Sequence, residues 1–218
     1  MVQSFTPSEL ILLHGEKFAQ RSRTERKTRL LHNGMLVNPV ELAQMAIASA
    51  LLANEAAGVH RMEIREITSL FGLRRRHGLV SLPVSGRHPW PEGSLEDQLQ
   101  GAEDEKGTEI LKLISDWLRY DHGDPFNEVL DRVKAGLASR GLLEVEEERR
   151  LKVLVARKYT LPEETRKLVE VQPIEPLQKL LEGTRQERAE VWQALLAQIK
   201  KALADRQQMT QEQIFDKL

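Results

Sequence analysis

The chain from Pro39 to Gly58 reads PVELAQMAIASALLANEAAG. Between Val40 and Ala53 almost every position is apolar or small, and no lysine or arginine interrupts the run. Helices that are apolar all round are buried on every side. Pro39 suits the first turn of such a helix and Gly58 its C-terminal cap. The acidic side chains in the stretch and the absence of a basic flank speak against a membrane span. We therefore predict a mainly α fold, a helical domain around a buried central helix over residues 39–58.

Further helices are predicted from capping residues and apolar spacing on both sides of this stretch. A brief one follows Thr6 and Pro7, and another opens after Ser94. The remaining helical segments are 110–117, 126–140 ending at Gly141, the region after Pro162 with breaks at Pro173 and Pro176, and a last long helix around 192–203 with a frayed tail from Gln207.

Short β-hairpins are predicted between the helices. Apolar residues at 62–67 and 79–84 read as strands, with turns at His77-Gly78 and Ser85-Gly86. A third strand is expected over 151–155, where Leu151, Val153 and Val155 alternate. We favour a buried strand there; the alternative is an exposed hairpin with basic flanks. Residues 16–34 are predicted as a loop or a loosely held helix.

The composition is that of a globular protein, and we treat residues 1–218 as a single domain. Apolar residues make up 40% of the chain and charged residues 30%, which is enough of each for a core and a hydrated surface. There is no cysteine, so disulfides and thiolate metal sites are excluded. The first nine residues lack the basic-then-apolar order of a secretory signal. We expect a cytoplasmic location.

The charge is distributed unevenly. The net charge is −1, but the first 90 residues carry a balance of +5 and the remainder −6. Basic residues gather at 21–29 and again at 74–76. A basic half indicates an anionic partner, either a lipid headgroup or a nucleic acid; pairing with the acidic half of the chain explains it equally well.

Sequence motifs of the common enzyme classes are absent. There is no phosphate-binding loop, dinucleotide fingerprint, nucleophile elbow or paired-histidine zinc motif. The six histidines are scattered, with no two at i, i+4. We predict a protein that is not an enzyme and needs no cofactor or metal.

The serial order of four segments resembles the Golgi phosphoprotein 3 family. Ala50–Arg61 is similar to that family's central helix ending in Gly-Arg, and Gly72–Arg76 to its glycine-plus-basic hairpin. Asp116–Leu118 is similar to its helix with Asp or Asn before Trp, and Arg132–Leu143 to its helix ending in basic-Gly-Val-Leu. The resemblance implies a mostly helical, peripheral membrane protein that binds anionic phospholipid headgroups, phosphatidylinositol 4-phosphate in the Golgi members.

The basic side chains in and beside these segments are the headgroup-binding candidates. They are Arg61, Arg74, Arg75, Arg76, Arg132 and Arg140. The family's headgroup tryptophan has no counterpart here, since the first tryptophan is Trp90, and of its basic positions only Arg132 is retained. The lipid hypothesis predicts that Arg74–Arg76 and the 149–158 hairpin share one face, with the acidic segment 101–109 elsewhere.

Two other functions compete with lipid binding. A helix followed by a hairpin is also the layout of a winged helix, which binds nucleic acid. However, the central helix has no basic side chain for phosphate contacts, and the pI is near 6.6, so no nucleic-acid partner is expected. The third reading is an oligomeric adaptor without a ligand. The sequence leaves homo-oligomer formation open.

Overall fold

Helix α2 (Pro39–Ala56) forms the centre of the molecule. The Asn38 side chain caps its N-terminus by accepting a hydrogen bond from the backbone N–H of Val40 at 3.0 Å. Gly58, with φ of +74°, ends the segment in the left-handed conformation that favours glycine. Leu42, Ile47 and Leu51 are fully buried. The predicted buried central helix, and with it the mainly α fold with short hairpins, is confirmed.

The computed structural model describes residues 4–22, 26–68, 75–84, 86–100, 107–118, 124–150 and 154–215. Within these ranges the helices besides α2 are α1 (Pro7–Leu13), α3 (Leu95–Gln100), α4 (Ile110–Trp117), α5 (Pro125–Ser139), α6 (Glu163–Val171), α7 (Glu175–Glu187) and α8 (Ala189–Phe215), with a 3₁₀ turn η1 (Gly15–Lys17). The strands are β1 (Thr28–Arg29), β2 (Leu36–Val37), β3 (His60–Thr68), β4 (Arg75–Pro83), β5 (Thr108–Glu109), β6 (Glu144–Arg150) and β7 (Leu154–Thr160).

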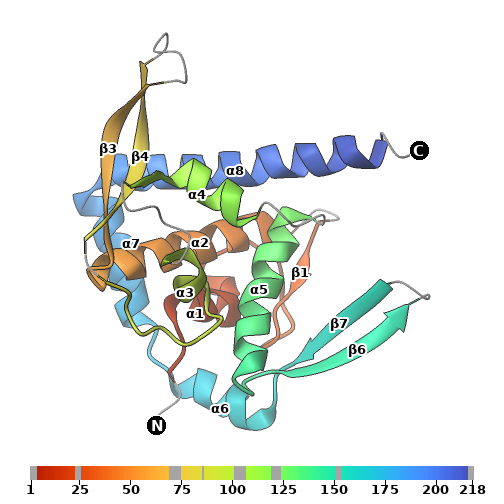
Figure 1. The fold of residues 1–218 in the computed structure, drawn as a ribbon. Helices are drawn as coiled ribbons and strands as arrows, with labels where there is room; N and C mark the ends of the chain where they lie inside the picture. The colour runs from red at the N-terminus through yellow and green to blue at the C-terminus, as the bar shows by residue number, and fades with distance from the viewer. Residues whose placement is uncertain are drawn as a thin grey trace.

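Helices cover α2 from several directions. It packs against α1, α3, α5, α7 and α8, and these helices surround it in Figure 1. Buried apolar side chains from α1 through to α8 form one cluster. No helix in the described ranges is both long enough and apolar enough to cross a membrane.

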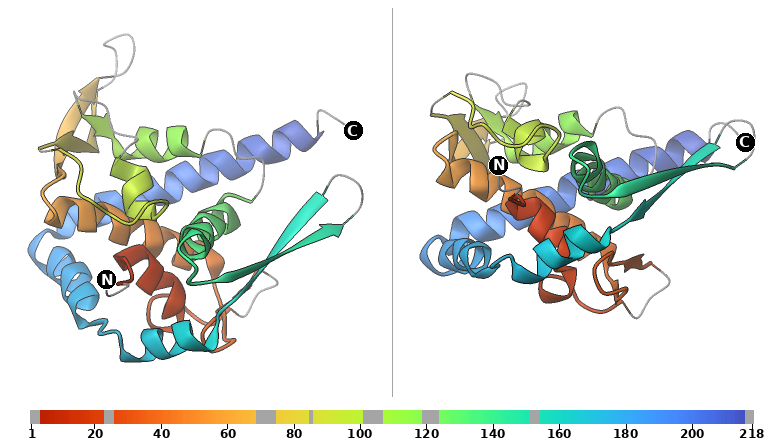
Figure 2. Two further views of the ribbon diagram at one scale, coloured as in Figure 1. Left: turned by 60° about the horizontal axis from the view of Figure 1, so that its bottom comes forward. Right: turned by 90° about the horizontal axis from the view of Figure 1, so that it is seen from below.

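Two antiparallel hairpins project from this helical body in different directions (Figures 1 and 2). In the first, β3 pairs with β4 from His60–Pro83 to Thr68–Arg75, and β5 adds a short third strand beside β4. In the second, β6 pairs with β7 from Glu144–Thr160 to Arg150–Leu154. A small pair of strands, β1 and β2, precedes α2.

The structure differs from the sequence predictions at three places. His77-Gly78 is not a turn but lies within β4, and a Cβ at Gly78 would collide with the Cδ1 atom of Ile67 on the neighbouring strand. Among the described residues of 16–34, the predicted loop is interrupted by the end of η1 and by the short strand β1. Helix α8 continues past Gln207 to Phe215. Ser85 and the predicted strand residues Leu151 and Val153 lie outside the described residues.

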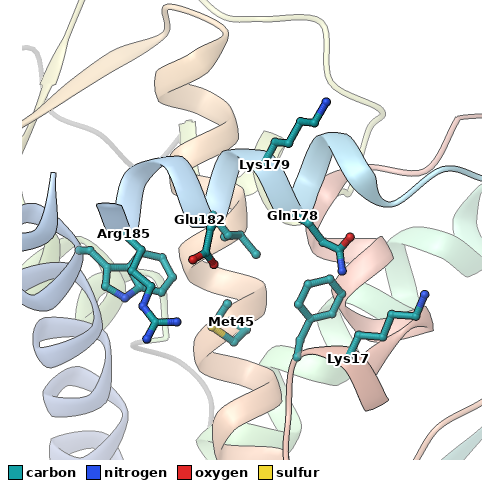
Figure 3. A pocket seen from close by; sticks show the side chains of 9 residues that line it. Lys17, Met45, Gln178, Lys179, Glu182 and Arg185 are labelled. Carbon is teal, nitrogen blue, oxygen red and sulfur yellow. The ribbon is translucent and has the colours of Figure 1, made fainter. Parts of the chain in front are cut away.

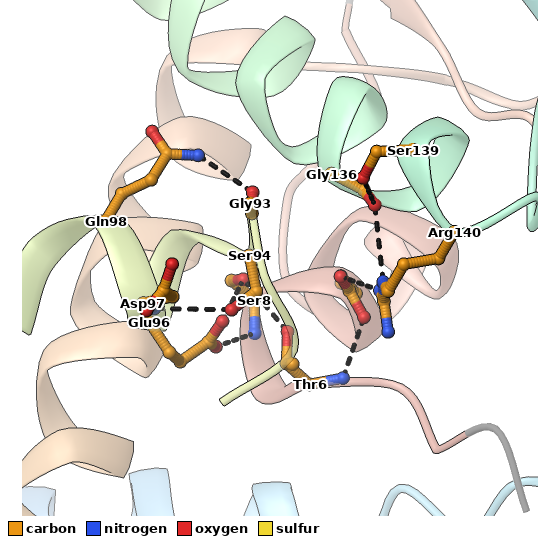
Figure 4. Close-up of polar contacts among 11 residues, drawn as sticks. Thr6, Ser8, Gly93, Ser94, Glu96, Asp97, Gln98, Gly136, Ser139 and Arg140 are labelled. Carbon is orange, nitrogen blue, oxygen red and sulfur yellow. Dashed lines mark hydrogen bonds and ion pairs between the residues drawn. The ribbon is translucent and has the colours of Figure 1, made fainter. Parts of the chain in front are cut away.

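A buried polar cluster ties α1, α3 and α5 together (Figure 4). The fully buried Glu96 accepts hydrogen bonds from the Ser8 backbone N–H at 2.7 Å and from the Ser8 hydroxyl at 2.9 Å. Glu9 is also fully buried; it accepts a bond from the Thr6 backbone N–H at 2.8 Å and pairs with Arg140. Burial raises the pKa of Glu96 from 4.5 to about 7. Between these two pH values the folded protein keeps a proton on this carboxyl that the unfolded chain releases.

The raised pKa of Glu96 makes stability depend on pH. Between pH 4.5 and 7 the native state binds one proton more than the unfolded chain, so this site's contribution is full below pH 4.5 and is lost as pH rises to 7. The loss is about 3 kcal/mol at 1.36 kcal/mol per pKa unit. Glu96→Gln removes the titration while keeping both contacts to Ser8, whose hydroxyl can turn to accept from the amide. Urea unfolding at pH 5 and pH 8 should show the wild type losing about 2.5 kcal/mol relative to this variant, because part of the loss has already occurred at pH 5; parallel profiles would contradict the assignment.

Two helical glycines should respond oppositely to alanine. A Cβ at Gly136 in α5 would collide with the carbonyl oxygen of Gly93 and lie 2.9 Å from its carbonyl carbon, both backbone atoms. Gly183 in α7 has nothing within 4 Å of that position. We expect Gly136→Ala to lower the free energy of unfolding by about 1–3 kcal/mol. Gly183→Ala should raise it by about 0.5–1 kcal/mol. Chemical denaturation measures both, and stabilisation by both substitutions would refute the close approach at Gly93.

Candidate functional site

The described candidate arginines of the first hairpin are all paired with carboxylates. Arg61, whose side chain is 63% exposed, contacts Glu63 at 2.5 Å. The Nε atom of Arg75 lies 3.2 Å from Glu66. Arg74 lies outside the described residues.

Arg76 makes the best-aligned ion pair of this hairpin. Its two terminal nitrogens donate to the two carboxylate oxygens of Glu109 at 2.6 and 2.7 Å, the two-point geometry that Arg–carboxylate pairs favour. Glu109 belongs to the acidic segment 101–109 that was predicted to lie elsewhere. That prediction is wrong at this residue, because β5 pairs with β4 and brings the carboxylate to the arginine.

The predicted common basic face is also not formed. Arg75 and Arg76 open β4, whereas Arg157 and Lys158 lie on β7, and the two hairpins point in different directions (Figure 2). Arg157 pairs with Glu147 at 3.3 Å and Lys158 with Glu146 at 3.2 Å. The cross-strand register therefore places acidic residues of β6 against basic residues of β7.

Arg132 is held against the protein by an aromatic ring and two polar contacts. Its guanidinium lies 4.4 Å from the ring centroid of Trp117, a cation–π distance. It also donates to the Gln98 side chain at 3.3 Å and to the Trp117 carbonyl at 3.4 Å. These contacts join α5 to α3 and α4.

Arg140 has a structural role at the C-terminus of α5. Its side chain is 19% exposed and pairs with the fully buried Glu9. Its Nε also donates to the Gly136 carbonyl at 3.3 Å. The five described candidates therefore do not assemble into one site: Arg61, Arg75 and Arg76 lie on the β3–β4 hairpin, whereas Arg132 and Arg140 lie on α5 and at its C-terminus.

A groove beside α7 gathers cations that the sequence analysis did not single out (Figure 3). It has a volume of about 530 Å³ and is lined by η1, α2, α7 and α8. The lining residues are Lys17, Phe18, Met45, Gln178, Lys179, Leu181, Glu182, Arg185 and Trp192. We call it the α7 groove.

The helical period of α7 explains how these side chains reach the groove. Leu177, Leu181 and Thr184 are buried. Gln178, Glu182 and Arg185, one position after each, form an exposed stripe at i, i+4 and i+7. Figure 3 shows Glu182 and Arg185 on the Met45 side of α7, with Lys179 rising from the other edge.

The N-terminal wall of the groove depends on Gly15. A Cβ there would lie 2.6 Å from Leu30 Cδ2 and 2.9 Å from Leu42 Cδ1, so a larger residue would have to displace these side-chain ends where η1 packs on the core. That packing brings Lys17 and Phe18 to the groove.

The cations of the α7 groove have no ionic partner within the described part of the chain. The side chains of Lys17, Lys179 and Arg185 make no ion pair or hydrogen bond there. The one carboxylate in the lining, Glu182, accepts a hydrogen bond from the Gln186 amide at 3.0 Å. Uncommitted cations above an apolar floor of Phe18, Met45 and Trp192 suit an anionic ligand.

Sequence signals for this site were weak. In the sequence, the stripe of Gln178, Glu182 and Arg185 looks like any solvent-exposed helix face. It becomes part of a groove only because η1 and α8 pack beside α7 in the fold. Across the described ranges, no group of three or more histidine, aspartate or glutamate side chains is arranged to hold a metal ion.

Comparison with models of protein families finds no match, and comparison with curated proteins finds none either. The resemblance to the Golgi phosphoprotein 3 family therefore stays a prediction from the order of its segments.

Alanine substitutions of Arg140 and Arg61 should differ in their effect on stability, because Arg140 pairs with a fully buried carboxylate, whereas Arg61 is exposed. Arg140→Ala leaves the buried Glu9 carboxylate without its cation, and we expect a loss of about 3–5 kcal/mol in the free energy of unfolding. Arg61→Ala, at an exposed pair, should change it by less than about 0.5 kcal/mol. Urea denaturation gives both values. An Arg140→Ala protein as stable as wild type, but unable to bind anionic vesicles, would make Arg140 a ligand residue instead.

Proposed function

We propose that this chain is a peripheral membrane protein that binds anionic phospholipid headgroups through the α7 groove. The observation that carries the proposal is that Lys17 and Arg185 have no ionic partner among the described residues and border an apolar, aromatic floor, with Lys179 at the other edge of α7. Tryptophan and long basic side chains are the residue types that favour a membrane–water interface. The resemblance to the Golgi phosphoprotein 3 family also implies a lipid ligand. The headgroup-binding arginines expected from it, however, are not the cations of the α7 groove.

Electrostatics sets the strength expected of such binding. Each lysine or arginine close to an anionic bilayer contributes about 1 kcal/mol. The groove offers Lys17 and Arg185, with Lys179 at its edge, and Glu182 opposes them. We therefore expect reversible and salt-sensitive association. Phosphatidylinositol 4-phosphate, with more negative charge than phosphatidylserine, should be bound more tightly.

The burial of α2 argues against the winged-helix alternative. A recognition helix must present an exposed face to the major groove, whereas α2 is covered by five other helices. An oligomeric adaptor without a ligand is the reading that failure of the lipid experiment would favour.

Removing two groove cations tests the proposal. Co-sedimentation with phosphatidylcholine vesicles containing phosphatidylserine or phosphatidylinositol 4-phosphate should show binding by the wild type that weakens with salt. The double variant Lys17→Ala/Arg185→Ala should bind roughly 30-fold more weakly, from about 2 kcal/mol. Vesicles of phosphatidylcholine alone should bind neither protein.

The matched control removes the same net charge elsewhere. Lys112→Ala/Lys201→Ala takes away two exposed lysines, each paired with an aspartate on its own helix, and should bind like wild type. Equal weakening by both double variants would show a response to overall charge rather than a site. Absence of wild-type binding to every vesicle would overturn the lipid function.

A further inference from the structure

A second hollow, distinct from the α7 groove, lies between the end of α2 and the start of α7. It has a volume of about 370 Å³, within the usual range of small-molecule sites. Its walls include Phe5, Leu10, Ala53, Trp90, Leu177 and Leu180. None of its lining side chains is an acid, a lysine or an arginine. We call it the apolar hollow.

The apolar hollow is formed by small side chains and held open by a fixed tryptophan. Ala53, Ala56 and Ala57 at the end of α2 leave the space. The Trp90 indole N–H donates to the Asn54 side chain at 2.5 Å, and the Asn54 amide donates to the Glu96 carbonyl at 3.0 Å. Because Asn54 is fully buried, this chain of bonds fixes the indole as a rigid wall.

A polar hollow continues the apolar one along α7. It has a volume of about 390 Å³ and shares Ala56 and Leu180 with the apolar hollow. Arg188, in its lining, is engaged by Glu55 at 2.7 Å and by the Met62 carbonyl at 2.8 Å. Lys179 also lines it, and its ammonium has no hydrogen bond or ion pair with the described residues.

Lys179 stands at the boundary of the two hollows. Pro176, three residues before Lys179, lines the apolar hollow, and Gly183, four residues after it, lines the polar hollow. All three residues lie on one face of α7. Glu187, the opposing acid of the polar hollow, is eight residues further on, about 12 Å along the helix axis. This exceeds the screening length of about 8 Å at physiological salt. Glu55, the other acid of the polar hollow, is engaged by Arg188. Lys179 makes no ion pair with Glu175 or Glu182 on its own helix, so its ammonium is available to an anion.

We propose that the two hollows bind a fatty acid, with its hydrocarbon chain in the apolar hollow and its carboxylate at Lys179. An uncharged trough that ends at one uncommitted ammonium complements a single chain with a single negative head. At about 30 Å³ for a group the size of a water molecule, the apolar hollow accommodates roughly twelve such groups, which corresponds to a chain of medium length. The proposal goes beyond the binding of membrane surfaces and uses different test residues.

Binding of a fluorescent fatty acid, 11-(dansylamino)undecanoic acid, tests this below its micelle concentration. The wild type should bind it saturably, and dodecanoate should displace it while acetate should not. Ala56→Phe fills the junction from an exposed position and should weaken both probe and dodecanoate at least tenfold. Lys179→Ala should weaken dodecanoate about fivefold and leave displacement by the uncharged dodecanol unchanged.

The control for Ala56→Phe is Ala197→Phe, at an exposed position of α8 outside these hollows, which should bind like wild type. Circular dichroism shows whether each variant folds. Three results would each overturn the proposal. They are the absence of saturable binding by the wild type, equal binding by the two phenylalanine variants, and an effect of Lys179→Ala that is the same for dodecanoate and dodecanol. Vesicle binding that survives Ala56→Phe would leave the headgroup function standing, so the two proposals fail separately.

Discussion

The burial of most of α2 is the constraint on which the other elements depend. A helix without a polar face has to be covered all round, and α1, α3, α5, α7 and α8 supply the cover. Alanines at 43, 46, 48, 50 and 53 let these helices approach closely. Two buried polar groups of α2 are satisfied within the protein: the Ser49 hydroxyl donates to the Ala46 carbonyl at 2.9 Å, and the Asn54 amide donates to the Glu96 carbonyl at 3.0 Å. Since most of the central helix is covered, a ligand reaches it only where the covering helices leave a groove or hollow, as at Met45 and at Ala53, Ala56 and Ala57.

Buried polar side chains fix how the covering helices meet. Glu96 on α3 receives two hydrogen bonds from Ser8 on α1, and Glu9 on α1 pairs with Arg140 at the end of α5. An unpaired carboxylate at these depths would be costly, so these contacts select one arrangement of the helices. The same arrangement places Trp90 against Asn54 and leaves the apolar hollow beside the end of α2.

The hairpins illustrate why a count of basic residues is a poor guide to a binding site. Residues two apart on a strand, or facing each other across a ladder, share a face of the ribbon. Arg61 therefore meets Glu63, and Lys158 meets Glu146. Arg76 is neutralised by Glu109, which arrives from a separate strand. The described candidate cations of the β3–β4 hairpin are thus paired in the fold, while Lys17 and Arg185, far apart in the sequence, line one groove without an ionic partner among the described residues.

The sequence alone determined the central helix, its proline start and glycine end, the stripe of α5 and the helix–hairpin order, because these depend on local spacing and capping. It misjudged His77-Gly78, which lies within β4 because that strand pairs with β3 along its whole length, and it misjudged the extent of α8. The tertiary structure alone decided which arginines are committed: the carboxylates that engage Arg76 and Arg140 lie 33 and 131 residues away along the chain. The α7 groove and the apolar hollow likewise exist only once distant helices pack, because their walls come from segments at both ends of the chain.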